Sequence, residues 1–309
     1  MKSPAVSLLD GIQSALNPQG PDAALIAEIS WVLIAGATLI FVAVMALAAY
    51  AVFAKRESAA RLSPRMLIVG GGIVFPALTL FVLLVYSLAR AASLHPVDEK
   101  ALRIEVVGEQ WWWRVHYLDA EGRRDFATAN EIRVPVGTPV ELRLKSADVI
   151  HSFWVPVLAG KLDMIPGKTN VLRVRADRAG EFRGQCAEYC GGPHAFMALY
   201  VVAENAEGYE RWAESQRRPA AEGNALFLAQ CAGCHTVRGT PAAGTLGPDL
   251  THVGSRLTIG AGLLPNNAGA LAGWIASSQH LKPGNLMPAF AHLPGEELRA
   301  LAGYLENLK

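Results

Sequence analysis

Two long apolar segments near the N-terminus constrain the fold of this chain more than any other feature. Residues 29–53 contain no charged side chain, and neither do residues 66–89, which are interrupted only by Gly70–Gly72 and Pro76. Each segment exceeds the roughly 20 residues that an α-helix needs to cross a bilayer. Both segments are therefore predicted to be transmembrane helices, forming a hairpin within an N-terminal region of residues 1–95.

The loop between these helices predicts their orientation. It contains four basic residues and one acid, Lys55, Arg56, Arg61, Arg65 and Glu57. Short loops rich in lysine and arginine stay in the cytoplasm. Both termini and everything after Arg90 are then predicted to lie on the periplasmic side of a bacterial inner membrane. The N-terminal segment lacks the basic start of a cleaved signal peptide, so the first helix is expected to direct targeting.

Charge and cysteine usage limit the classes of function. The formal net charge is +1, which suggests neither nucleic acid nor an acidic substrate as a partner. All four cysteines fall inside two short motifs, described below, so none is left for a structural disulfide even in an oxidising compartment. This distribution favours cofactor chemistry.

The first motif is a set of soft metal donors. Residues Cys186 to Met197 have the sequence C-A-E-Y-C-G-G-P-H-A-F-M, and His151 lies upstream in D-V-I-H-S-F-W. Thiolate, thioether and imidazole donors together select copper over hard cations. Two cysteines on one loop can bridge two coppers, each of which then needs its own histidine. A disulfide or a zinc knuckle is the alternative, but a disulfide needs neither His194 nor Met197, and zinc rarely takes methionine.

The region around this motif has the pattern of short β-strands. Apolar residues alternate from Arg103 onward, and turn signals separate the segments. Such punctuation predicts a β-sandwich or Greek-key barrel. We expect one end loop to carry His151 and another to carry Cys186 to His194, with Met197 opening the next strand. The predicted strands are 103–107, 111–117, 132–134, 140–145, 170–175, 181–184 and 196–202.

The second motif predicts a covalent haem. Cys231-Ala-Gly-Cys234-His235 is a c-type haem attachment sequence, in which both thiols bind the haem and His235 ligates the iron. Met287 is the only methionine after it, and residues 296–308 predict an amphipathic closing helix. A His/Met ligand pair saturates the iron and raises its potential, as an electron carrier requires. A polar, partly helical linker, 207–218, precedes this region.

The order of these motifs resembles a known family. The helical hairpin, E-Q-W-W-W, D-V-I-H-S-F-W-V-P, K-L-D-M-I-P-G and the copper loop resemble cytochrome c oxidase subunit II across roughly residues 25–205. Residues 220–309 resemble a class I cytochrome c. The resemblance implies a multidomain membrane protein with a two-helix transmembrane hairpin, an all-β cupredoxin domain (96–206) and an all-α cytochrome c domain (219–309).

The resemblance also implies specific site residues. Cys186 and Cys190 would bridge a binuclear copper centre. One copper would be completed by His151 and Met197, and the other by His194 and the backbone carbonyl of Glu188. The Glu188 side chain would reach a magnesium ion at the interface with subunit I. Trp111 would match the family's exposed tryptophan, through which electrons reach the copper.

The function implied is electron input to a haem–copper terminal oxidase. Electrons would pass from a donor, such as a cytochrome c or a quinol–cytochrome c reductase, through haem c and the copper centre to subunit I. There oxygen would be reduced to water with proton pumping, and subunit III would complete the assembly. One departure is that residues 67–69 lack the acid that often feeds a proton channel, which leaves Glu57 as a weak substitute.

Three other functions compete with this interpretation. A copper-containing nitric-oxide reductase could use an equivalent subunit. Nitrous-oxide reductase shares the copper motif but not the membrane hairpin, which counts against it. A copper-delivery or storage protein is a different class, and it would give no role to a covalent haem.

Overall fold

The computed structural model describes residues 11–53, 63–91, 101–220 and 222–309. Four of the five charged loop residues that predict the orientation, Lys55, Arg56, Glu57 and Arg61, lie outside these residues, as does the predicted domain boundary at 95/96. The chain divides into two compact units, one comprising residues 24–96 and the other the remaining residues.

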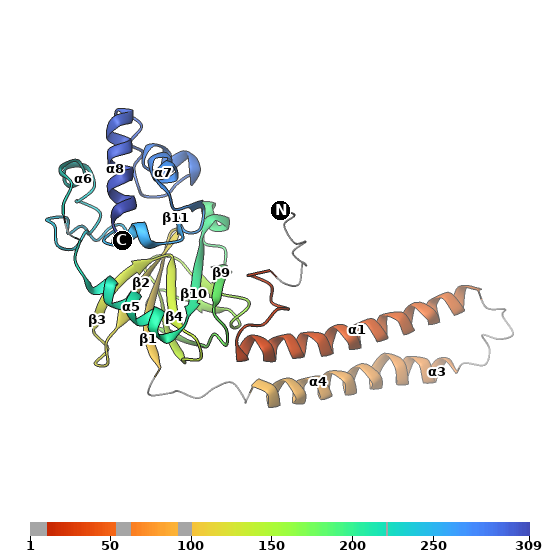
Figure 1. Cartoon of the computed structure of the whole chain (residues 1–309). Helices are drawn as coiled ribbons and strands as arrows, with labels where there is room; N and C mark the ends of the chain where they lie inside the picture. Colours follow the sequence, from red (N-terminus) through yellow and green to blue (C-terminus); the bar gives the residue numbers. More distant parts are fainter. Residues whose placement is uncertain (1–10, 54–62, 92–100, 221) are drawn as a thin grey trace, which may run out of the picture. The chain divides into compact units, whose positions relative to one another are not determined.

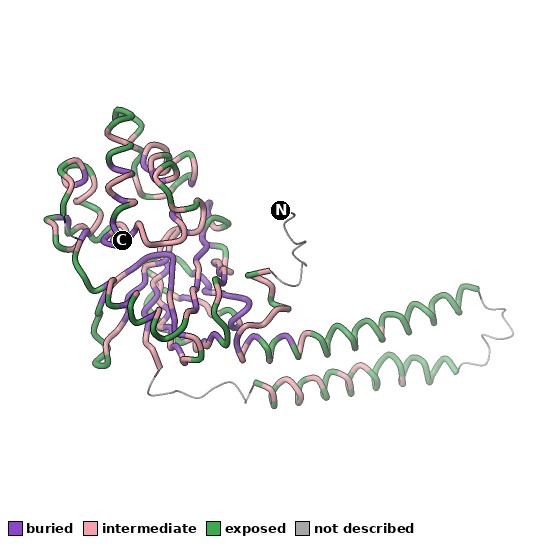
Figure 2. The backbone as a smooth tube through the Cα atoms, viewed as in Figure 1, coloured by how far each residue is buried: buried purple, intermediate pink, exposed green. Residues whose placement is uncertain are grey.

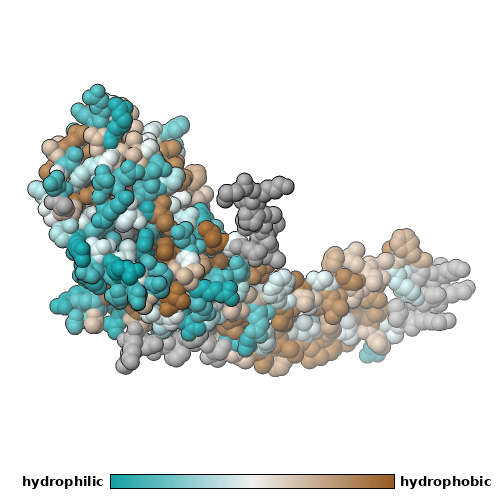
Figure 3. All heavy atoms as spheres, viewed as in Figure 1, coloured by the Kyte–Doolittle hydropathy of each residue, from teal (hydrophilic) through white to brown (hydrophobic). Residues whose placement is uncertain are grey.

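Two apolar helical segments dominate the smaller unit. Helix α1 spans Pro21–Phe53, eight residues more at its start than predicted. The second segment contains α3 (Pro64–Met66), a π-helix η1 (Leu67–Val74) and α4 (Phe75–Ala91). Among the described residues, both segments are long and apolar enough to cross a membrane, and apolar side chains cover their surface (Figure 3). The predicted hairpin is confirmed.

Local sequence accounts for the π-helix. The Phe75 amide donates to the Gly70 carbonyl, five residues earlier, as a π-turn requires. Three consecutive glycines weaken the ordinary helix there, and Pro76 has no amide proton to continue it. Near the opposite end of the pair, the Glu28 carboxylate forms an ion pair with Arg90 and accepts a hydrogen bond from the Tyr86 hydroxyl.

Ten strands form two five-stranded sheets in the larger unit, and several of these strands are labelled in Figure 1. The strand order is β3-β2-β1-β5-β8 in one sheet and β4-β10-β9-β6-β7 in the other. The strands are β1 (Leu102–Glu109), β2 (Trp112–Leu118), β3 (Arg124–Ala129), β4 (Glu131–Pro135), β5 (Val140–Ser146), β6 (His151–Trp154), β7 (Leu162–Met164), β8 (Asn170–Val174), β9 (Gly180–Cys186) and β10 (Ala198–Glu204).

The hydrophobic core lies between the two sheets. Buried residues alternate along β5, where Val140, Leu142 and Leu144 are each at most 1% exposed. Trp113 and Phe153 are fully buried and pack edge to face, with ring centroids 5.7 Å apart. Figure 2 shows this buried layer along the strands. The all-β cupredoxin prediction is confirmed.

Three strand-level predictions were wrong. Strands β3, β6 and β7 were not predicted, and His151, expected on a loop, is the first residue of β6. The first three residues of β6 are all buried, so the strand has no alternation to detect. Met197 lies one residue before β10 instead of opening it, because a 3-10 helix, η2 (Gly192–Phe196), occupies the start of the predicted strand.

The segment predicted as a linker is a helix packed on the sandwich. Helix α5 spans Ala206–Arg217. It is capped by the preceding residue, Asn205, whose side chain accepts a hydrogen bond from the Gly208 amide. Tyr209 and Ala213 are buried in the same apolar core as the strands. The helix therefore extends the sandwich to the boundary of the haem domain.

The remaining residues form the predicted helical domain. Phe227 from α6, Ile275 from α7 and Leu301 from α8 belong to its separate apolar core. Helix α7 was not predicted, whereas α8 matches the closing helix. The elements are α6 (Ala225–Gln230), η3 (Val253–Ser255), β11 (Thr258–Ile259), β12 (Leu264–Pro265), α7 (Ala268–Leu281) and α8 (Gly295–Asn307).

Candidate copper and haem sites

The structure brings the predicted copper donors together around two thiols. The Sγ atoms of Cys186 and Cys190 are 3.8 Å apart. Cys186 Sγ lies 3.8 Å from His151 Nδ1 and 3.1 Å from the Glu188 carbonyl oxygen. Cys190 Sγ lies 3.4 Å from the Nδ1 of His194 and 3.9 Å from the Sδ of Met197. All six predicted donors thus surround one small volume.

Strand pairing fixes this arrangement. Cys186 ends β9, directly opposite Phe153 of β6, so His151 two residues earlier lies close to the thiol. The Cys186 amide also donates to the Met197 carbonyl at 2.9 Å, which joins the two ends of the loop. Cys186, Cys190 and Met197 are each at most 4% exposed. The donors are therefore preorganised and largely shielded from water.

Asp148 sets the orientation of the His151 ring. Its Oδ1 lies 2.8 Å from His151 Nε2 and accepts that proton, which leaves Nδ1 as the lone-pair donor facing the thiols. Gly108 provides the space for the ring, because a Cβ there would lie 2.8 Å from His151 Cδ2. Sequence reasoning missed both residues, although Asp148 lies in the D-V-I-H segment that contains the ligand.

The two thiols titrate as a pair. The contact with Cys190 and, more weakly, that with His151 lower the pKa of Cys186 despite the opposing effect of burial. The contact with Cys186 and burial raise the pKa of Cys190. Burial lowers the pKa of His151, but its contacts with Cys186 and Asp148 outweigh burial and raise it. The cluster already favours one thiolate, the form that binds metal.

The carboxylate of Glu188 is partly exposed and lies near a lysine. Its side chain is 45% exposed, and Oε2 lies 3.8 Å from Lys161 Nζ. The backbone carbonyl of this residue thus lies beside Cys186 Sγ, whereas its carboxylate lies beside Lys161.

Trp111 contacts the copper loop directly. Its Nε1 donates to the Cys190 carbonyl at 2.9 Å, and Gln110 Nε2 donates to the same oxygen at 2.8 Å. Gly191 has a φ of +117° and allows close approach, since a Cβ there would lie 2.9 Å from the indole. Trp111 is half-buried rather than exposed as expected, because Gly284 of the helical domain lies against its ring.

The haem motif lies on the turn after α6. The His235 amide donates to the Cys231 carbonyl at 3.0 Å. His235 Nδ1 donates to the Pro248 carbonyl at 2.8 Å, which leaves Nε2 free to bind iron. A Cβ at Gly247 would lie 2.5 Å from His235 Cε1, so this position needs glycine. Burial lowers the pKa of His235 and favours the neutral ligand form.

The remaining predicted haem residues lie in the helical domain. Cys231 and Cys234 form no disulfide, and Cys231 and Met287 both pack against the apolar core of the helical domain. The Met287 carbonyl accepts hydrogen bonds from Ser278 Oγ at 3.0 Å and Gln279 Nε2 at 2.7 Å. These contacts hold the methionine loop against α7. The donors present fit a covalently bound haem.

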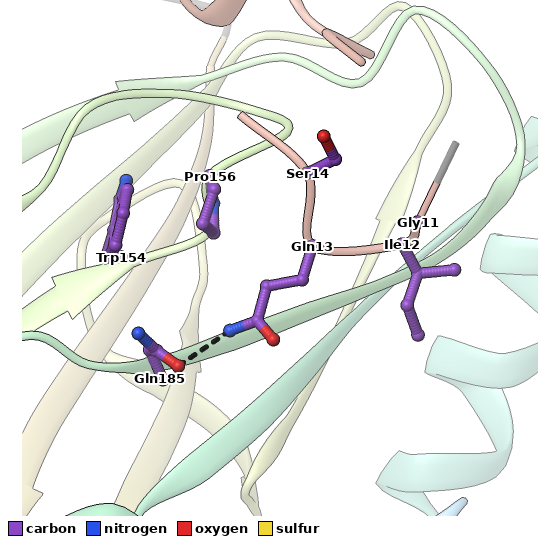
Figure 4. Close-up of a pocket in the computed structure, with 7 residues that line it drawn as sticks. All are labelled: Gly11, Ile12, Gln13, Ser14, Trp154, Pro156 and Gln185. Atoms are coloured by element: carbon purple, nitrogen blue, oxygen red, sulfur yellow. Dashed lines mark hydrogen bonds between the residues drawn. The ribbon is translucent and has the colours of Figure 1, made fainter. Parts of the chain in front are cut away.

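An open hollow on the sandwich lies outside both donor sets. The N-terminal segment lines one side with Ile12 and Gln13, and Trp154 and Pro156 line the other (Figure 4). Gln13 Nε2 donates to Gln185 Oε1 at 2.8 Å across it. Its lining contains no thiol, imidazole or carboxylate, so we assign it no chemistry.

The fold and donors define a membrane protein with a cupredoxin domain and a cytochrome c domain. Residues 102–204 match the family described as cytochrome C oxidase subunit II, periplasmic domain, and residues 220–309 match cytochrome c. Cytochrome c oxidase subunit 2 of Bacillus sp. (strain PS3) is 31% identical over 263 residues, covering 76% of this chain and 72% of that relative. The chain belongs to the cytochrome c oxidase subunit II family.

Other similar proteins carry the same description. Cytochrome c oxidase subunit 2 of Alkalihalophilus pseudofirmus is 40% identical over 222 residues, which are 69% of this chain but 63% of that relative. The match thus spans slightly less than two thirds of that relative. The periplasmic domain of subunit II of cytochrome oxidase (CoxB) of Bradyrhizobium japonicum is 31% identical, covers 40% of this chain and 97% of that structure, and has a TM-score of 0.37.

Proposed function

We propose that the chain is the electron-input subunit of a haem–copper terminal oxidase. It would pass electrons from a donor, through haem c and a binuclear copper centre, to subunit I, where oxygen is reduced to water with proton pumping. The observation that carries the proposal is the gathering of four further donors, two imidazoles, a thioether and a backbone carbonyl, around two buried thiols. A storage protein would need neither that geometry nor a tethered haem.

The copper ligands are assigned residue by residue. Cys186 and Cys190 would bridge both metals, with His151 and Met197 on one copper and His194 with the Glu188 carbonyl on the other. A bound copper pair would supply one-electron redox chemistry. The chain's own contribution is to exclude water from the thiols, to hold His151 through Asp148 and to keep Trp111 hydrogen-bonded to the copper loop.

The residues that would attach the haem and ligate its iron are assigned in the same way. Cys231 and Cys234 would attach the haem, and His235 and Met287 would ligate its iron. The Pro248 carbonyl holds the His235 ring in the tautomer that leaves Nε2 available. Trp111 would transmit electrons between the two centres, because its indole contacts the Cys190 carbonyl on one side and the helical domain on the other.

The remaining assignments concern the assembly. We place the metal domains and both termini on the periplasmic side, with the helices packed against subunit I and with subunit III in the same complex. The half-exposed Glu188 carboxylate would bind magnesium at the subunit I interface, where Lys161 is its present neighbour. The proposed regions are 1–95 for the anchor, 96–206 for copper, 207–218 for the connecting helix and 219–309 for haem.

Cys190→Ser tests this function in the assembled oxidase. After rapid reduction of the haem, its reoxidation is followed optically. The variant should lose internal reoxidation, whereas Thr169→Ser, an exposed change in the same domain, should match the wild type. Unchanged reoxidation in Cys190→Ser would show that the haem does not deliver electrons to this cluster.

A further inference from the structure

One lysine of the haem domain is buried where that domain meets the sandwich. Lys282 follows α7 and is 3% exposed. Its Nζ donates to the carbonyl oxygens of Trp111 at 2.6 Å, Phe196 at 2.7 Å and Gly260 at 3.0 Å. An ammonium has three N–H donors, and each of them has an acceptor here. Two acceptors belong to the sandwich and one to the haem domain.

The three acceptors make the contact selective for one alignment of the domains. A buried ammonium is strongly unfavourable when it loses its hydrogen bonds, so a small shift of the haem domain would leave Lys282 desolvated and unpaired. Burial lowers its pKa to about 7. The three carbonyls favour the protonated form and so act to raise the pKa, because a neutral amine has only two N–H groups for three acceptors.

The acceptor segments lie beside the electron-transfer residues. Phe196 immediately precedes the copper ligand Met197. The next residue, Ala198, donates its amide to the Ala261 carbonyl of the haem domain at 3.0 Å. Gly284, two residues after Lys282, has a φ of +85° and lies against the Trp111 ring. The Lys282 segment therefore covers the indole through Gly284. Lys282 also binds the backbone of Trp111 and of Phe196.

Further hydrogen bonds surround this contact. The Leu257 amide donates to Glu131 Oε2 at 2.7 Å, and an Arg114 Nη donates to the Thr245 carbonyl at 3.0 Å. These bonds join the same two domains at other points. Lys282 differs from them because its ammonium binds the Trp111 backbone itself.

We propose that Lys282 is a positioning residue that holds this chain's own haem domain in one register over Trp111. The tryptophan face is then closed to a separate donor protein, which must reduce the haem instead. This inference rests on the proposed function, because that function gives Trp111 its role between haem and copper.

Hydrogen exchange in the full chain tests the positioning role. The Ala198 amide reports on docking through its bond to Ala261, and the Gly247 amide, bonded to the Cys234 carbonyl at 2.8 Å, reports on the haem domain alone. Lys282→Met should speed exchange at Ala198 about tenfold or more through local opening and leave Gly247 unchanged. The control Lys309→Met, at the exposed C-terminus, should leave both amides unchanged. Equal Ala198 exchange in all three chains would overturn the proposal.

Amine labelling of the wild-type chain gives a second test that does not depend on how the variant folds. Lys282 should react with an acylating reagent about tenfold or more slowly than Lys309, because burial keeps the reagent from its amine. Its lowered pKa would by itself speed the reaction, so slow labelling reports burial. Labelling of both lysines at similar rates would overturn the docked arrangement.

A functional readout separates this inference from the proposed function. In the assembled wild-type oxidase, a soluble one-electron protein donor should reduce the haem before the copper, whereas Lys282→Met should allow part of the copper to be reduced directly. Copper reduction in the same order in both proteins would contradict the closure of Trp111. Absence of a copper pair from the wild type would instead refute the proposed function, whatever the exchange and labelling results.

Discussion

Asp148 offers a graded test of how the chain holds its copper. Its Oδ1 accepts hydrogen bonds from the Val149 amide at 2.6 Å and from His151 Nε2 at 2.8 Å, and its Oδ2 accepts one from the Gln110 amide at 2.6 Å. Three donors therefore depend on one carboxylate. Hydrogen bonds to a charged acceptor are roughly twice as strong as neutral ones.

The two possible substitutions should differ in size. In Asp148→Asn the remaining oxygen can still serve His151, but the new amide group faces a backbone N–H and loses that bond. Asp148→Ala loses all three bonds and leaves the His151 ring without its fixed tautomer. Loss of such an outer contact typically costs about 10- to 100-fold in metal affinity. We expect the asparagine variant near the lower figure and the alanine variant near the upper one.

Copper affinity measured by competition with a chelator of known affinity gives the comparison. Asp177→Ala is the matched control, since Asp177 pairs with Arg175 at 2.9 Å and has no contact with the cluster. It should bind copper as the wild type does. Wild-type affinity in Asp148→Ala would refute the claim that this carboxylate orients the ligand.

Three further predictions use other contacts. Trp111→Phe removes the indole donor and should slow internal haem reoxidation about tenfold, which corresponds to roughly 1.4 kcal/mol of barrier, without loss of copper. Trp112→Phe is the control. Equal reoxidation rates in the two variants would contradict the assigned path. Burial lowers the pKa of His116 from 6.5 to about 4, so the unfolded chain takes up this proton first as the pH falls. The free energy of unfolding should therefore drop between pH 6.5 and 4, by up to about 3 kcal/mol, and denaturant titrations of His116→Phe should show a smaller drop; an equal drop would exclude His116 as its source. Gly247→Ala should reduce covalent haem content in a pyridine haemochrome assay because its methyl group would collide with the His235 ring; full haem content would show that the loop can yield.

The sequence predicts the architecture where patterns are long or regular. The uncharged segments define both membrane helices, and alternation in β5 and β10 matches their burial. It does not predict β6, which is short and has three consecutive buried residues. It also misses α7, whose small and apolar residues, A-G-A-L-A-G-W-I-A-S-S, lack a clear polar face. Such elements are defined by their tertiary contacts.

The residues of the copper and haem sites also divide into those that the sequence identifies and those that only the fold reveals. Cysteine, histidine and methionine spacing identifies the donors, because their chemistry is carried by the residue types themselves. Asp148 and Gly108 act through the His151 ring, and Lys282 acts through backbone carbonyls from three distant segments. No local pattern marks these three residues. Their roles depend on which segments the fold brings together.

Electron paramagnetic resonance of the purified, copper-loaded chain tests the central claim most directly. Two coppers per chain, with one unpaired electron shared equally between them, are the predicted result, and Cys186→Ser should abolish the shared signal. A hyperfine pattern from a single isolated copper in the wild type would contradict the account.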